Sequence, residues 1–191
     1  MKKMKILVAT AFAAMTVGVT AATTPFEISL FCPPLSIPWC DDVSGLRLDL
    51  LSGINRNVSG LDIGTLANIT EANGAGLQLC GFYNRVGEGK GLAQFAALMN
   101  RCDENYRGIQ FAAVYNEVGE QLSGASLAAM NIAKTAKGLQ FGIFNTTDRL
   151  VGMQFGIVNY ADDAERGVQV GLINIMPEAR IPVSTIVNIG F

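Results

Sequence analysis

Acidic side chains and cysteines are the main candidates for chemistry in this chain, because the sequence contains no histidine. Nucleophilic catalysis of the Ser-His or Cys-His kind is therefore excluded. The densest acidic group, Asp162, Asp163 and Glu165, falls in a polar stretch between two apolar segments, where solvated surface carboxylates are the expected arrangement. The sequence predicts no enzyme, no catalytic residue and no cofactor.

The four cysteines are Cys32, Cys40, Cys80 and Cys102, and their spacing matches no zinc-binding pattern. We therefore expect no metal site. Cys32 and Cys40 enclose a proline-rich loop and are the favoured disulfide in an oxidising compartment. Cys80 and Cys102 fall in neighbouring repeats, where a disulfide and two buried free thiols are equally compatible with the sequence.

Residues 1–21 have the pattern of a secretory signal peptide. Basic residues in Met1–Lys5 precede the apolar run Ile6–Val19, which is too short to span a bilayer as a helix. Small residues up to Ala21 predict cleavage before Ala22; a retained anchor is the alternative. Cleavage would change the net charge from −2 to −5, because the leader holds three lysines and no acid. An acidic chain is a poor nucleic-acid binder. Because of the signal peptide pattern, we expect an exported protein of the cell envelope.

A recurring asparagine marks a repeat of 14 to 16 residues. A glycine stands seven to nine residues ahead of most of these asparagines, and a glutamine follows most of the glycines. The asparagines are Asn68, Asn84, Asn100, Asn116, Asn131, Asn145, Asn159, Asn174 and Asn188, and the glutamines are Gln78, Gln94, Gln110, Gln140, Gln154 and Gln169. Asp62 and Ser126 replace the glutamine in two repeats.

Each repeat carries one clear strand pattern. In the segment 138–145, Leu139, Phe141 and Ile143 alternate with Gln140 and Gly142. This period of two predicts a strand with its apolar side chains in the core and small or polar residues on the other face. Copies before residue 117 hold one more residue between glutamine and asparagine, which predicts a bulge in the strand. We expect the glutamines to form a structural ladder; a strip that binds carbohydrate or peptide is the alternative.

Two architectures place one strand in each repeat: a β-solenoid with parallel stacked coils, and an antiparallel outer-membrane-type β-barrel. The alternating segment Val183–Phe191 resembles the last strand of such barrels. However, the connections are uniform in length, and each strand offers fewer apolar positions than a bilayer requires. We therefore predict an all-β solenoid over residues 45–191, with a proline-rich cap at 22–44 and an atypical last strand at 180–191.

The repeated units, such as Gly138-Leu-Gln-Phe-Gly-Ile-Phe-Asn145, and the end Val187-Asn-Ile-Gly-Phe191 resemble an uncharacterised family of bacterial exported surface-repeat proteins. The resemblance covers about residues 43 to 191. It implies a bacterial origin and a location in the envelope or at the surface, and it brings no catalytic residue or established ligand.

The expected function is therefore that of a structural or interaction protein of the bacterial envelope, presenting a repetitive β surface. Its expected partners are envelope or host-surface proteins or glycans. The alternative is a small outer-membrane barrel acting as a pore or anchor, the one case in which we expect membrane contact.

Overall fold

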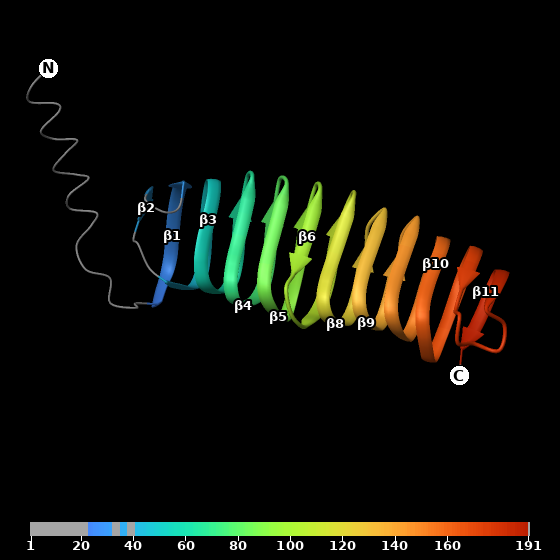
Figure 1. Cartoon of the computed structure of the whole chain (residues 1–191). Helices are drawn as coiled ribbons and strands as arrows, with labels where there is room; N and C mark the ends of the chain where they lie inside the picture. The colour runs from blue at the N-terminus through green and yellow to red at the C-terminus, as the bar shows by residue number, and fades with distance from the viewer. Residues whose placement is uncertain (1–22, 32–34, 38–40, 191) are drawn as a thin grey trace, which may run out of the picture.

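The structure is a computed structural model that describes residues 23–31, 35–37 and 41–190. Figure 1 shows the strands stacked side by side along one axis, from the N-terminal to the C-terminal end. In chain order they are β1 (Thr23–Phe31), β2 (Leu35–Ile37), β3 (Asp42–Gly64), β4 (Ala67–Cys80), β5 (Tyr83–Ala96), β6 (Met99–Cys102), β7 (Tyr106–Ala112), β8 (Tyr115–Leu127), β9 (Met130–Phe141), β10 (Phe144–Ile175) and β11 (Val183–Gly190).

Neighbouring coils pair in parallel: β4 with β5, β8 with β9, and β9 with β10. Each coil advances the chain by one strand spacing, about 4.8 Å. An antiparallel meander would instead reverse the chain at every connection. The predicted β-solenoid is therefore confirmed, with about eight turns, and the barrel alternative is wrong.

Equivalent residues of successive coils stack in register. Asn116 lies opposite Asn131, and Gly124 lies opposite Gly138. One coil departs from the pattern: Leu92, and not Gly91, lies opposite the glycines of the neighbouring coils. The side chain of Leu92 is buried, so it contributes to the core at a position where other coils have glycine.

Both ends of the array reverse the strand direction. β1 pairs in parallel with β3 and forms the first rung, while β2 folds back antiparallel to β1. At the other end, β11 follows Pro177 and Pro182 and runs antiparallel to β10. Cys32 and Cys40, with their predicted disulfide, lie outside the described residues, as does the predicted signal peptide 1–21.

The strand that follows the repeat glycine has the predicted period of two, but its sides are reversed. Gln140 is fully buried, whereas Phe141 is 56% exposed and Ile143 is 44% exposed. The prediction that these apolar side chains form the core is therefore wrong. The reversal is possible because a buried amide pairs with the same amide in the next coil, so that few polar groups lose water without a partner.

The apolar core lies on another side of the coil, behind the segment that follows the repeat asparagine. Val86, Cys102 and Val118, each two residues after an asparagine, face inward as predicted. The whole cluster consists of Val86, Leu92, Cys102, Tyr106, Val118, Leu122, Ala133, Ala136, Leu150, Ala161, Ala164 and Met176. The interior is thus divided into an amide-lined part and an apolar part.

The extra residue of the longer coils lengthens the strand that precedes the bend, because the bends have two residues in longer and shorter coils alike, as at 97–98 and 142–143. Pairing is unbroken from Gln94 to Ala96 against Gln110 to Ala112, and the bends follow at residues 97–98 and 113–114. The predicted bulge is therefore not found in this strand. The added residues Ala96 and Ala112 stand at the end of this strand and pair with each other without a register shift.

Candidate interaction face

The repeat asparagines form a hydrogen-bonded ladder inside the solenoid. Asn84 Nδ2 donates to Asn100 Oδ1 at 2.9 Å, and the same contact recurs in each coil up to Asn159 and Asn174, which lie 2.8 Å apart. Each amide also donates to the backbone carbonyl of a residue on the next strand of its coil, as Asn100 does to Phe111. The asparagine therefore ties the two sides of the bend together.

Two members of the asparagine series depart from this ladder. Asn68 donates to the carbonyl of Leu79, and its own Oδ1 accepts no hydrogen bond. Asn188 lies on β11 opposite Gln169 and donates to the carbonyl of Ile181. The reversal of the chain before β11 therefore places Asn188 against the glutamine column.

The glutamines form a second ladder that donates in the opposite direction. Gln94 Nε2 donates to Gln78 Oε1 at 2.7 Å, and Gln154 donates to Gln140 at 2.8 Å, in both cases toward the N-terminus. The series is interrupted at Ser126, whose hydroxyl donates to Asn131. All six glutamines are at most 1% exposed, so a ligand outside the solenoid does not reach them.

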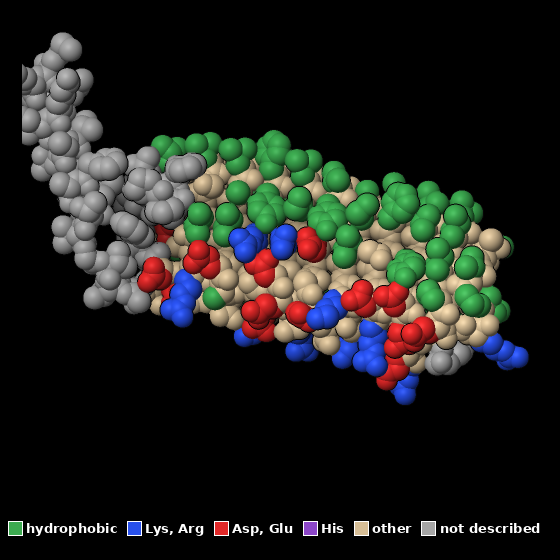
Figure 2. Space-filling model, in the orientation of Figure 1, with side chains coloured by type: hydrophobic (Ala, Val, Ile, Leu, Met, Phe, Trp, Pro, Cys, Tyr) green, Lys and Arg blue, Asp and Glu red, His purple; other side chains and the backbone are tan. Residues whose placement is uncertain are grey.

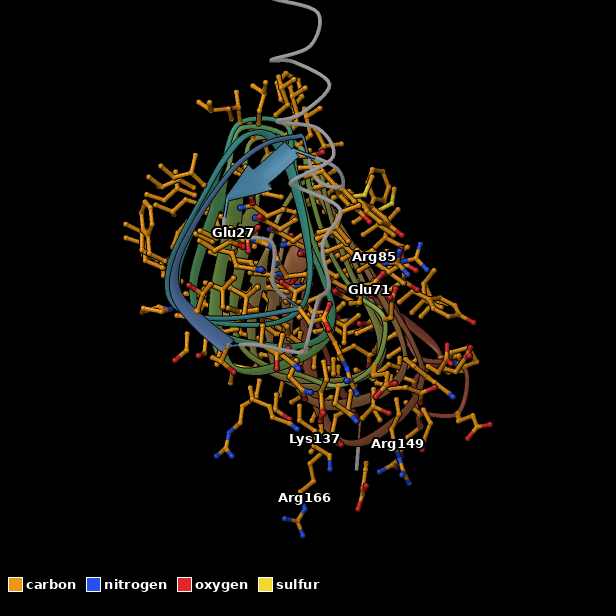
Figure 3. All side chains as sticks on the ribbon, turned by 90° about the vertical axis from the view of Figure 1, so that its left-hand side faces the viewer. Glu27, Glu71, Arg85, Lys137, Arg149 and Arg166 are labelled. Atoms are coloured by element: carbon orange, nitrogen blue, oxygen red, sulfur yellow. The ribbon has the colours of Figure 1, made fainter. Side chains whose placement is uncertain are left out.

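A buried ionic cluster ends the glutamine ladder at its N-terminal side. Gln78 donates to Asp62, a carboxylate that accepts without needing to donate further. Arg47 forms two hydrogen bonds with Asp62, at 2.6 and 2.8 Å, and its Nε lies 3.0 Å from Asp49. Glu27 also lies inside the coil, as Figure 3 shows in the view along the axis.

Burial raises the pKa of Asp49 to about 6, although Arg47 and a hydrogen bond from Ser29 act to lower it. Arg47 and Asp62 are both 0% exposed. The cluster therefore has no open side for a substrate, and its chemistry is that of a buried structural network. Within the described ranges, no three histidine, cysteine, aspartate or glutamate side chains are arranged to hold a metal ion.

Cys80 and Cys102 are buried free thiols, the second of the two predicted alternatives. Cys80 pairs with Ala96 and lies beside the bend, whereas Cys102 pairs with Val86 and belongs to the apolar core. The two residues thus occupy different columns of the coil, which is why no disulfide joins them. Burial raises the pKa of Cys102 to about 11.

The outer side of the coil from the repeat glycine to the repeat asparagine carries no exposed charge. The stretches are 60–68, 76–84, 91–100, 108–116, 124–131, 138–145, 152–159 and 167–174, and their one charged residue is the buried Asp62. Figure 2 shows the result: a band of hydrophobic side chains runs the length of the array, and the charged side chains lie in a separate band.

We call this outer surface the apolar face. It consists of exposed large hydrophobic side chains, whose burial against a partner would be favourable. They are Ile63, Leu66, Phe82, Phe95, Leu98, Met99, Ile109, Phe111, Val114, Met130, Phe141, Ile143, Phe144, Met153, Ile157, Leu172 and Ile173. Over these eight coils the face is about 34 Å long. Soluble monomers rarely expose a continuous apolar surface of this extent, and such surfaces mark interaction sites.

An open groove follows the bend along the middle of the apolar face. Its floor is made of small residues, one or two from each coil, and its walls are large apolar side chains. The floor consists of Ala112, Ala113, Ala128, Ala129, Gly142, Gly156 and Gly171, and the walls include Phe111, Phe141, Phe155, Ile143, Ile157 and Leu172. A Cβ on Gly142 would meet the carbonyl oxygen of Ala128 at 2.1 Å, so the close stacking of the coils requires glycine there.

Sequence reasoning missed the apolar face, although a signal for it was present. An outward strand face in water normally carries some charged side chains, and none of the eight stretches carries an exposed one.

Among the residues that the structure describes, no helix has the length and apolarity needed to span a membrane. Family models, curated protein sequences and solved structures gave no match to this chain.

Proposed function

We propose that this protein is a non-catalytic attachment protein of the bacterial envelope that binds a lipid surface through its apolar face. The observation that carries the proposal is the separation of charge around the coil. Apolar side chains cover the bend and its two flanks, while the exposed charges are confined to the segment between each repeat asparagine and the next glycine.

A lipid partner suits this face because the face has few hydrogen-bonding groups. The backbone amides and carbonyls of the strands are paired along the axis with neighbouring coils, and the glutamines and asparagines point inward. The face therefore offers very few hydrogen-bonding groups to a peptide or a glycan. Hydrocarbon needs none, and burial of apolar area supplies the binding energy.

The signal peptide pattern and the family resemblance support export and an envelope location. The structure changes the expectation about membrane contact. The sequence linked membrane contact to a barrel alone, whereas an outward apolar face gives a solenoid a way to lie on a membrane without crossing it. The charged side then remains in water as the repetitive surface presented to other partners.

Vesicle flotation of the processed chain, which starts near Ala22, tests the proposal. We expect the chain to float with lipid vesicles, and a variant with Ile109→Ser, Phe141→Ser and Leu172→Ser to stay at the bottom of the gradient. These side chains are 49%, 56% and 66% exposed, so about half of each remains to be buried. The three changes together should weaken binding by about 3 kcal/mol, or roughly a hundredfold.

The control variant is Thr146→Ser with Ser123→Ala, which changes polar positions outside the apolar face. It should float like the unchanged chain. If the unchanged chain fails to float with vesicles of any composition, or forms stable dimers through this face in place of binding lipid, the proposed function is wrong.

A further inference from the structure

We propose that a row of cations at one border of the apolar face binds anionic lipid headgroups, so that the protein selects membranes rich in acidic phospholipid. This inference rests on the proposed function, because the apolar face must first meet a lipid surface. The row consists of Lys90, Arg107, Lys137 and Arg166.

The cations share one place in the coil, next to the first strand of the apolar face. Arg107, Lys137 and Arg166 each directly precede a repeat glycine, and Lys90 lies opposite Arg107 in the neighbouring coil. Register continues from Arg107 through Ser123 to Lys137. Figure 3 shows Lys137 and Arg166 projecting outward from the same lower edge of the cross-section. All four side chains are exposed.

Three of these cations have no anionic partner among the residues that the structure describes. In the part of the chain that the structure describes, Arg107, Lys137 and Arg166 take part in no ion pair. Several other exposed cations are paired: Lys134 lies 3.0 Å from Glu120, and Arg149 lies 3.6 Å from Glu165. The charges of Arg107, Lys137 and Arg166 are therefore free to pair with an external anion, whereas Lys90 already lies 2.8 Å from Glu88.

The position that carries the row holds no acid in any repeat. The residues directly before the other repeat glycines are Ser59, Ala75, Ser123 and Val151. The acids Glu104, Glu120 and Asp163 each lie four residues before a repeat glycine, and Glu165, two residues before Gly167, lies 3.6 Å from Arg149. Although the chain as a whole is acidic, the border of the apolar face is therefore locally positive.

An anionic amphiphile satisfies both features at once. Its hydrocarbon lies against the apolar face, and its phosphate lies beside the long arginine and lysine side chains, which can reach from the apolar border to the headgroup level. Arg107 and Lys137 lie two coils apart, or about 9.6 Å along the axis, so that neighbouring headgroups can engage separate cations. A purely apolar partner would leave the row without a ligand.

The test compares binding of the processed chain to vesicles of phosphatidylcholine alone and to vesicles with about one third phosphatidylglycerol. We expect binding to the anionic vesicles to be at least tenfold tighter and to weaken as salt is raised. A variant with Arg107→Gln, Lys137→Gln and Arg166→Gln should lose about a hundredfold on anionic vesicles, because each cation near an anionic surface contributes roughly fivefold. Its binding to phosphatidylcholine should not change.

The matched control is Arg101→Gln with Lys134→Gln and Arg149→Gln, which removes the same charge from cations that are paired on the protein. It should keep the preference for anionic vesicles. Equal loss in both variants, or equal binding of the unchanged chain to both vesicle types, would overturn the inference while leaving the proposed function intact. Failure to bind either vesicle type would instead refute the proposed function. Unchanged thermal unfolding verifies that each variant is folded.

Discussion

Replacement of Gln154 by leucine should destabilise the solenoid strongly, whereas replacement of its neighbour Met153 by serine should not. Gln154 is fully buried, and Met153 is 46% exposed. The side chain of Gln154 donates to Gln140 at 2.8 Å and to the carbonyl of Tyr160 at 3.1 Å, and it accepts from Gln169 at 2.8 Å. Leucine has a similar size and can make none of these bonds.

The expected magnitude follows from the groups left without partners. The Oε1 of Gln140 and the carbonyl of Tyr160 each lose a buried donor, while Gln169 keeps its second bond, to the carbonyl of Ile175. At about 1–3 kcal/mol for each of these two unsatisfied buried groups, Gln154→Leu should cost about 2–6 kcal/mol. Met153→Ser removes a side chain that is only half buried and should cost about 1 kcal/mol.

Guanidinium unfolding followed by far-UV circular dichroism measures both variants against the unchanged chain. The midpoint should fall much further for Gln154→Leu than for Met153→Ser. If Met153→Ser is the more damaging change, then the apolar side chains point into the core and the assignment of inner and outer faces is wrong.

Three further predictions concern the interior. Gly138→Ala should lower the thermal unfolding temperature of the protein far more than Gly91→Ala does. A Cβ on Gly138 would meet the carbonyl oxygen of Gly124 at 2.0 Å, whereas a Cβ on Gly91 would meet nothing within 4 Å. Equal effects of the two changes would contradict the close stacking of the coils at Gly138. Burial raises the folded-state pKa of Asp49 to about 6 from its usual 3.8, so its contribution to stability should be complete below about pH 4 and be lost as pH rises through 6, by up to about 3 kcal/mol. Asp49→Asn should remove this slope from the unfolding free energy between pH 4 and 7, and an unchanged slope would refute the assignment. Burial raises the pKa of Cys102 to about 11. Iodoacetamide at pH 8 should therefore alkylate Cys102 at least a hundredfold more slowly than free cysteine, and rapidly only after unfolding. Fast labelling of the folded chain would show that the thiol is accessible.

The sequence was sufficient to predict the repeat, the strand in each coil and the solenoid, because those depend on spacing. Stacked parallel coils bring equivalent residues together, so the regular intervals between Asn84, Asn100 and Asn116 translate directly into a column. The place of Asn188 could not be found in this way. Its spacing continues the series, yet the chain reverses before β11 and sets it against Gln169.

The alternation pattern alone could not predict which face of the strand points into the solenoid. A period of two shows which side chains share a face, and it does not show which face is inside. The usual preference for buried apolar residues then placed Phe141 in the core. In this fold, identical amides such as Gln140 and Gln154 satisfy one another along the axis, which removes most of the penalty for burying them. The lack of exposed charge in the eight stretches was a sequence signal for the apolar face, and the structure shows that the apolar side chains of these stretches point outward.

The measurement that tests the central claim most directly compares two positions on β10 with a polarity-sensitive fluorophore. The variants Ile157→Cys, on the apolar face, and Asp148→Cys, on the charged segment, are labelled in a chain in which Cys32 and Cys40 are replaced by serine. On addition of anionic vesicles, we predict a blue shift of the fluorophore at position 157 and no change at position 148. A shift at position 148 alone, or none at either position, would contradict the account.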